Sequence, residues 1–149
     1  MAALNATFLI VTVSLVFQIV VLFLLLYGYT FYRRLKFRKH GIMMALAVFV
    51  HLATVFAVMV PSFVLAVFPH YILLHPLELT SIFSLIHEVT GALALGLGVW
   101  FVVSWRFRKS FTGCFNKRRA MLATMIIWLL ALTFGIALYS IFNWSILMG

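Results

Sequence analysis

Three potential metal ligands recur along one side of the second apolar stretch of this chain. His40, Met44 and His51 are separated by four and then seven residues. At about 100° of rotation per helical residue, their side chains fall within roughly 40° of one another. Imidazole and thioether groups are ligands of haem iron and copper, so this spacing predicts a haem or copper site. The alternative is structural, with His40 as an interfacial cation and Met44 as an ordinary apolar residue.

A second candidate pair lies at a common depth along two neighbouring apolar stretches. With a rise of about 1.5 Å per residue, His51 lies about 15 Å and Met59 about 27 Å beyond residue 41. Counted back from residue 104, which we expect at the same end, His87 lies about 26 Å along its helix. His87 and Met59 are therefore candidate axial ligands of one haem. His51 has no histidine at its own depth, so its partner ligand is a methionine, comes from a second chain, or is absent.

Only two acidic residues occur in the chain, and one of them lies well inside an apolar stretch. A charged Glu88 at this depth costs at least about 2.5–3.5 kcal/mol. We therefore expect its carboxyl group to be protonated, paired or turned toward a wet or protein interior, where it could carry protons or charge. His87 precedes it, but neighbouring helical side chains diverge by about 100°, so the two are not expected to share one partner. Glu78 is expected to cap the start of its helix.

The candidate ligands lie in four stretches that are apolar enough to cross a membrane. About 20 residues span about 30 Å of hydrocarbon, and the four stretches cover about residues 8–30, 41–68, 79–104 and 120–142. With 66% hydrophobic and 9% charged residues, the chain has more apolar side chain than a soluble domain can bury. We predict an all-α integral membrane protein, with a single four-helix transmembrane domain over residues 1–149 in an antiparallel bundle.

Prolines and small residues predict local features of these helices. Pro61 should kink the second helix. Gly91, Ala94 and Gly98 place small side chains near one face of the third helix, which allows a neighbouring backbone to approach closely. The connection over residues 69–78 is expected to be a loop, whose two histidines are solvated.

All eleven Lys and Arg residues fall into two clusters, at residues 33–39 and 106–119. These are the first and third connections between the apolar stretches. Positively charged loops stay in the cytoplasm, so we predict a multi-pass protein of the cell (plasma) membrane with cytoplasmic basic loops and extracytoplasmic termini. The net charge of +9 does not indicate nucleic-acid binding, because no solvated basic face is available. Membrane lipid is the expected partner.

Three short segments carry a resemblance to a known family over about residues 29–143. They are residues 39–45 (KHGIMMA), residues 82–87 (IFSLIH), and residues 124–129 (TMIIWL) with Gly135 and Tyr139. They resemble the small four-helix membrane protein family of unknown function that includes CtaM, also called YozB. That resemblance implies a role in the maturation or function of haem–copper terminal oxidases. The family tends to have a histidine just before its last helix, where this chain reads NKRR at residues 116–119.

Three functional hypotheses follow. The first is a protein of the respiratory apparatus that holds haem or copper through His40, Met44, His51 and His87. It would act as a maturation factor or as an accessory subunit of a haem–copper oxidase or larger membrane redox complex. The second is a b-type electron-transfer cytochrome. The third is a proton- or ion-conducting subunit centred on Glu88, or a purely structural one. The sequence contains no nucleophile–base pair, so we do not expect an enzyme that acts on its own.

Overall fold

The computed structural model describes residues 2–107 and 118–148, and the regular structure in those ranges is entirely helical. In chain order the elements are α1 (Ala2–Arg33), α2 (Phe37–Thr54), η1 (Val55–Met59), α3 (Val60–Ser62), η2 (Phe63–Ile72), α4 (Leu79–Phe107) and α6 (Arg118–Met148). The segments η1 and η2 are π-helical, and with α2 and α3 they form one continuous span. Part of the second basic cluster (Arg108, Lys109 and Lys117) lies outside the described residues, as does Asn116 of the NKRR segment.

Four helices in the described ranges are long and apolar enough to cross a membrane. They are Thr12–Arg33, Phe37–Ile72, Leu79–Trp105 and Arg118–Phe142. Large apolar side chains on every span remain exposed, among them Phe23, Phe49, Val89 and Ile126. Such an outward-facing apolar surface suits lipid as the surrounding solvent. The prediction of all-α structure in the described ranges, with four helices long and apolar enough to span a membrane, is confirmed.

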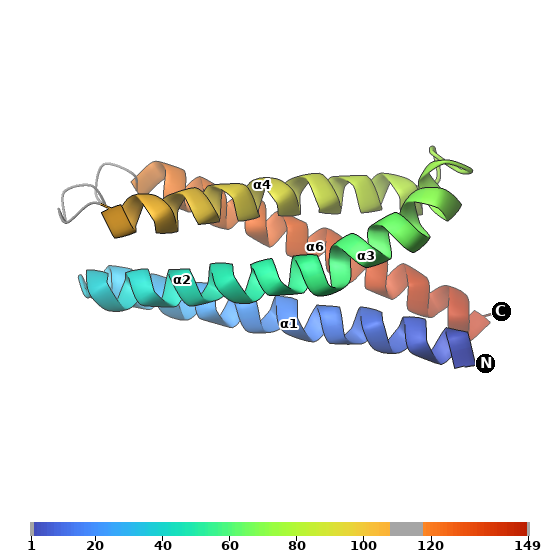
Figure 1. Ribbon diagram of the computed structural model, residues 1–149, viewed down its shortest axis with the longest axis horizontal. Coiled ribbons are helices and arrows are strands. Elements are labelled where there is room, and N and C mark those ends of the chain that lie inside the picture. Colours follow the sequence, from blue (N-terminus) through green and yellow to red (C-terminus); the bar gives the residue numbers. More distant parts are fainter. Residues whose placement is uncertain (1, 108–117, 149) are drawn as a thin grey trace.

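The spans are arranged as two helix pairs. α1 packs mainly on α2, and α4 packs mainly on α6, while contacts between α2 and α4 and between α1 and α6 join the pairs. Figure 1 shows the N- and C-termini at one end of the molecule and the α1–α2 junction at the other. The chain reverses at that junction through Leu35, which has a φ of 57°.

The buried core lies where the two pairs meet. It consists of Val21, Leu25, Ala47, Val48, Ala94 and Trp128. Gly98 of α4 permits this packing, because a Cβ atom there would lie 3.0 Å from Val48 and 3.2 Å from Trp128. Two members of the predicted small-residue face, Ala94 and Gly98, are therefore buried between helices. The third, Gly91, faces open space instead.

The second span bends and runs farther than the sequence predicted. Figure 1 shows its path changing direction at α3, which contains Pro61, in agreement with the predicted kink. The helix also continues past Pro69 to Ile72, and the Leu73 N–H donates to the Phe68 carbonyl at 3.0 Å. This bond joins residues that are five apart in sequence, as in a π-helix. The wider π-helical path accommodates a proline, which has no N–H to donate. The predicted loop over residues 69–78 was therefore too long, and His70 belongs to η2.

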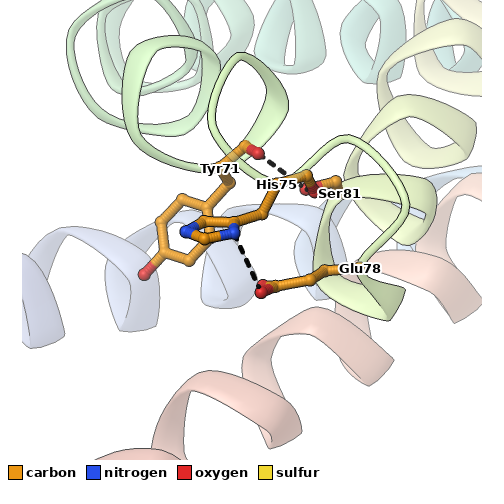
Figure 2. Close-up of polar contacts among 4 residues, drawn as sticks. All are labelled: Tyr71, His75, Glu78 and Ser81. Atoms are coloured by element: carbon orange, nitrogen blue, oxygen red, sulfur yellow. Dashed lines mark hydrogen bonds and ion pairs between the residues drawn. The ribbon is translucent and has the colours of Figure 1, made fainter.

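A compact turn joins η2 to α4 (Figure 2). The buried Ser81 hydroxyl lies 3.0 Å from the Tyr71 carbonyl and 2.8 Å from the His75 carbonyl, so it ties the turn to the first turn of α4. The His75 Nδ1 atom lies 3.3 Å from the Glu78 carboxylate. The Glu78 carbonyl accepts from the Ile82 N–H at 3.0 Å. Glu78 therefore occupies the capping position that was predicted, although its side chain pairs with His75.

Candidate functional site

A cavity of about 450 Å³ lies inside the bundle, and all four spans contribute to its wall. Most of the lining is apolar. Six side chains that contain a polar group or sulfur also line it: Gln18 from α1, His51 from α2, Met59 from η1, His87 and Glu88 from α4, and Trp128 from α6. Pockets for small ligands and cofactors typically measure about 300–1,000 Å³ and combine apolar walls with a few polar groups. This cavity fits that description and is the candidate site.

The His51 side chain is the polar group of the site whose unpartnered atoms are fully buried. The residue is only 5% exposed, and neither ring nitrogen has a hydrogen-bond partner within the described residues. Its ring packs against Trp128, with centroids 5.0 Å apart and planes inclined by 60°. A buried polar group without a partner costs about 1–3 kcal/mol. Because such groups are rare in native structures and call for an explanation, His51 is the strongest candidate for a ligand-binding side chain.

The His87 imidazole, in contrast, is held in a defined orientation. Its Nδ1 atom lies 2.8 Å from the Ala131 carbonyl oxygen of α6, which can only accept, so Nδ1 is the donor. The neutral ring then keeps an unprotonated Nε2 atom. A histidine that donates one N–H to a backbone carbonyl is the usual arrangement for metal-ligating histidines. Gly135 makes room for this ring, because a Cβ atom there would lie 2.9 Å from His87 Cε1.

His51 and His87 line the same cavity, although helical register predicted different depths. The cavity extends along the second span from His51 to Met59, which corresponds to about 12 Å of α-helical rise. One elongated cavity therefore covers both levels. The contacts on α6 agree, since His51 packs on Trp128 and His87 bonds to Ala131 only three residues farther.

Met59 and Glu88 also line the cavity, so a ligand bound there would contact them. Met59 belongs to the π-helical segment η1, and Glu88 is partly buried on α4. Within the described part of the chain, no hydrogen bond or ion pair to the Glu88 carboxyl group is found. Glu88 and its neighbour His87 both line the cavity, although neighbouring helical side chains diverge by about 100°. The cavity is therefore wide enough to be lined by both of these neighbouring α4 residues.

The other two predicted ligands, His40 and Met44, are not part of the cavity wall. The His40 Nδ1 atom donates to the Gly28 carbonyl of α1 at 2.9 Å. The Met44 side chain also reaches Gly28, where a Cβ atom would collide with its methyl group. The two residues therefore meet α1 at one buried glycine. The structure does not bring His40 and Met44 together with His51 and His87.

Two residues of the site were not selected from the sequence. Gln18 is a lone amide within the first apolar stretch, and a Cβ atom on Gly135 would lie 2.9 Å from its Oε1 atom. Its isolation among apolar residues was the available signal. Trp128 appeared only within a family motif, and nothing in the sequence indicated that its ring would pack against His51.

The protein ligands at the site are few. Among the described residues, no group of three or more His, Cys, Asp and Glu side chains is placed to hold a metal ion. Two histidines and a methionine remain as candidates. Any metal centre here would need further donors from outside this set.

Comparisons with protein-family models, curated proteins and solved structures returned no match for this chain. The resemblance to the CtaM family is therefore a hypothesis that rests on its three short segments.

Proposed function

We propose that this protein is a small component of the respiratory apparatus that binds a metal centre, haem b or copper, through His51 and His87. The observation that carries the proposal is the buried His51 imidazole, whose ring nitrogens have no partner in the described residues and which belongs to the wall of a cavity shared with His87. Met59 lines the same cavity and offers a thioether as an alternative ligand. A haem or copper centre bound there would supply one-electron redox chemistry.

The chemistry of the two imidazoles supports a metal centre over other ligands. A metal ion binds an unprotonated imidazole nitrogen, and the hydrogen bond to Ala131 leaves His87 Nε2 in that state. Binding at His51 would satisfy a nitrogen whose desolvation is otherwise uncompensated. Haem iron accepts His/His or His/Met axial ligands, and copper accepts the same side chains.

We further propose that the protein works with other membrane proteins, as a maturation factor or accessory subunit of a haem–copper oxidase or a larger membrane oxidoreductase complex. The resemblance to the CtaM family supports this role. The chain has four spans joined by short connections, so most of its surface faces lipid or neighbouring membrane subunits. No enzymatic reaction by the chain alone is part of the proposal.

The proposed topology is an antiparallel bundle in the cell membrane, with both basic loops cytoplasmic and both termini extracytoplasmic. The two Lys/Arg clusters support it through the positive-inside rule. Single-cysteine variants test it in intact cells. They are made in a Cys114→Ser background, which removes the one native cysteine of the chain. A membrane-impermeant maleimide should label Leu77→Cys, in the turn before α4, but not Lys36→Cys, in the first basic loop. Labelling of Lys36→Cys without cell lysis would contradict the topology.

Absorption spectra and metal analysis of the mildly solubilised protein test the metal centre. We expect a Soret band or stoichiometric copper in the wild-type protein, and loss of either in His51→Phe and His87→Phe. His75→Gln is the matched control, because His75 lies in the outer turn and its change should leave cofactor content unaltered. A folded wild-type preparation with neither haem nor metal, after supplementation with both, would refute the proposal.

Co-purification and redox measurements on the cofactor-bound protein then distinguish its possible roles. Co-purification with oxidase subunits would support a maturation or accessory role. Reversible haem reduction in the isolated protein, without a partner complex, would favour a b-type electron-transfer cytochrome.

Glu88 supports a second candidate function, proton or ion conduction. Its carboxyl group lines the same cavity as His87, and intramembrane carboxyl groups commonly mark proton paths. Proton flux into liposomes that contain the purified protein tests this function. A flux that is lost in Glu88→Gln, with unchanged cofactor content, would support conduction. The absence of flux in the wild-type protein would exclude it.

A further inference from the structure

The cavity reaches the outer surface of the bundle between the second span and α4. Five exposed residues line the cavity, among them Val60 and Leu129. The other three are Phe56 of η1 and Ala92 and Gly96 of α4, and together we name these three the side opening. A Cβ atom built on Gly96 meets no neighbouring side chain or element within 4 Å. The side opening lies within membrane-length helices, so in a bilayer an opening at this position would face the hydrocarbon.

The interior wall next to the side opening is also unfilled. Gly91 lines the cavity, and a Cβ atom there likewise meets nothing within 4 Å. Two glycines one and a half turns apart on α4 therefore leave space that side chains would otherwise occupy. Since protein interiors are normally close-packed, the unfilled space beside Gly91 in the cavity wall leaves room for a bound ligand.

The size of the cavity indicates what kind of occupant fits. A single water molecule needs about 10–15 Å³ of cavity volume, so 450 Å³ is roughly 30 to 45 times that requirement. A bare copper ion bound to two histidines would leave most of this apolar volume empty. A large apolar ligand would fill it and would bury its own surface favourably.

The number of protein ligands points in the same direction. The described residues hold no cluster of three or more His, Cys, Asp and Glu side chains, so the protein donors at the cavity are two histidines and the Met59 thioether. A metal tetrapyrrole brings four nitrogen donors with it and takes only one or two axial ligands from the protein. His51 and His87, or one of them with Met59, meet that need.

We infer that the site takes a lipid-soluble metal tetrapyrrole, which enters from the bilayer through the side opening. This inference rests on the proposed metal-binding function and narrows it to one ligand class and one route. His51, 5% exposed and without a partner in the described residues, is the side chain that such a ligand would engage. Gly91 and Gly96 would provide the room for it to pass.

Transfer of iron protoporphyrin IX from phosphatidylcholine vesicles to the apoprotein in nanodiscs tests the inference. Growth of the Soret band of the bound haem gives the rate. Gly96→Phe places a ring in the side opening and should slow transfer at least tenfold, with the wild-type band position at saturation. Leu93→Phe is the matched control, because Leu93 is exposed on α4 but does not line the cavity, and its rate should stay within twofold of wild type. Ala92→Phe, also in the side opening, replaces Gly96→Phe if that variant does not fold.

Three outcomes would overturn the inference, and they differ in what they leave standing. Equal transfer rates in the wild-type, Gly96→Phe and Ala92→Phe proteins would refute the side opening and leave the metal centre intact. Stoichiometric binding of Cu(I), measured separately, without haem binding would refute the tetrapyrrole and retain the proposed function. Binding of neither probe by folded wild-type protein would refute both.

Discussion

Replacing His51 with phenylalanine distinguishes the effect of this residue on the stability of the apoprotein from its proposed role in cofactor binding. Phenylalanine keeps an aromatic ring against Trp128 and removes both ring nitrogens, which have no hydrogen-bond partner in the described residues. If the imidazole is retained for a ligand, the apoprotein should become more stable when it is removed. The cofactor-loaded state should be lost at the same time.

The expected gain follows from the cost of a buried polar group without a partner, about 1–3 kcal/mol. A larger ring inserted into a packed core costs about 1–3 kcal/mol, which could cancel the gain. Here His51 adjoins a cavity of about 450 Å³, so the extra ring atoms have space and the gain should prevail. For a chain of this length, the apoprotein midpoint should rise by about 2–12 °C.

Thermal unfolding of the apoprotein in detergent, followed by tryptophan fluorescence, measures this shift. His87→Phe is the matched control, because it removes the hydrogen bond to the Ala131 carbonyl and should lose about 0.5–1.5 kcal/mol. The two histidines should therefore shift the midpoint in opposite directions. If His51→Phe lowered the apoprotein midpoint by several degrees, the His51 nitrogens would be satisfied in the protein, and the case for a ligand at His51 would fail.

Two further variants, with Gly96→Ala as a control, test the contact between Gly135 and His87 in the site and the bond between His40 and Gly28 outside it. Gly135→Ala should destabilise the protein by about 1–3 kcal/mol and reduce cofactor content, because the new methyl group would lie 2.9 Å from His87 Cε1. Gly96→Ala enters open space and should be neutral or stabilising in the same unfolding assay; equal losses in both would contradict the close approach of His87 to Gly135. His40→Ala should cost about 0.5–1.5 kcal/mol through its lost bond to the Gly28 carbonyl. It should leave haem and copper content unchanged, and a loss of metal would restore His40 as a ligand.

Local sequence patterns were sufficient to predict those features of the fold that depend on a single helix. The four spans followed from uninterrupted apolar length, because in lipid a helix satisfies its own backbone hydrogen bonds. The bend at Pro61 followed from a missing N–H. Continuation of the helix through Pro69 did not, because the π-helical path that accommodates this proline has no simple sequence signal.

Contacts between helices could not be predicted from these local patterns. His40, Met44 and His51 share one stripe of α2, yet His40 and Met44 meet Gly28 on α1 while His51 faces the cavity. Helical periodicity predicts a shared stripe, but it does not say which neighbouring helix each residue of the stripe meets. Rise along the helices likewise separated His51 from His87, whereas one elongated cavity includes both.

The sequence by itself determined that this protein is helical and suited to a membrane, and that its ionisable groups within the apolar spans are few. Those properties depend on composition and on spacing along one chain segment. The tertiary structure alone decided which of these groups share a cavity, which imidazole donates to Ala131 and which has no partner in the described residues. The reason is physical: side chains that are 36 residues apart in sequence are brought together only by the packing of helix against helix.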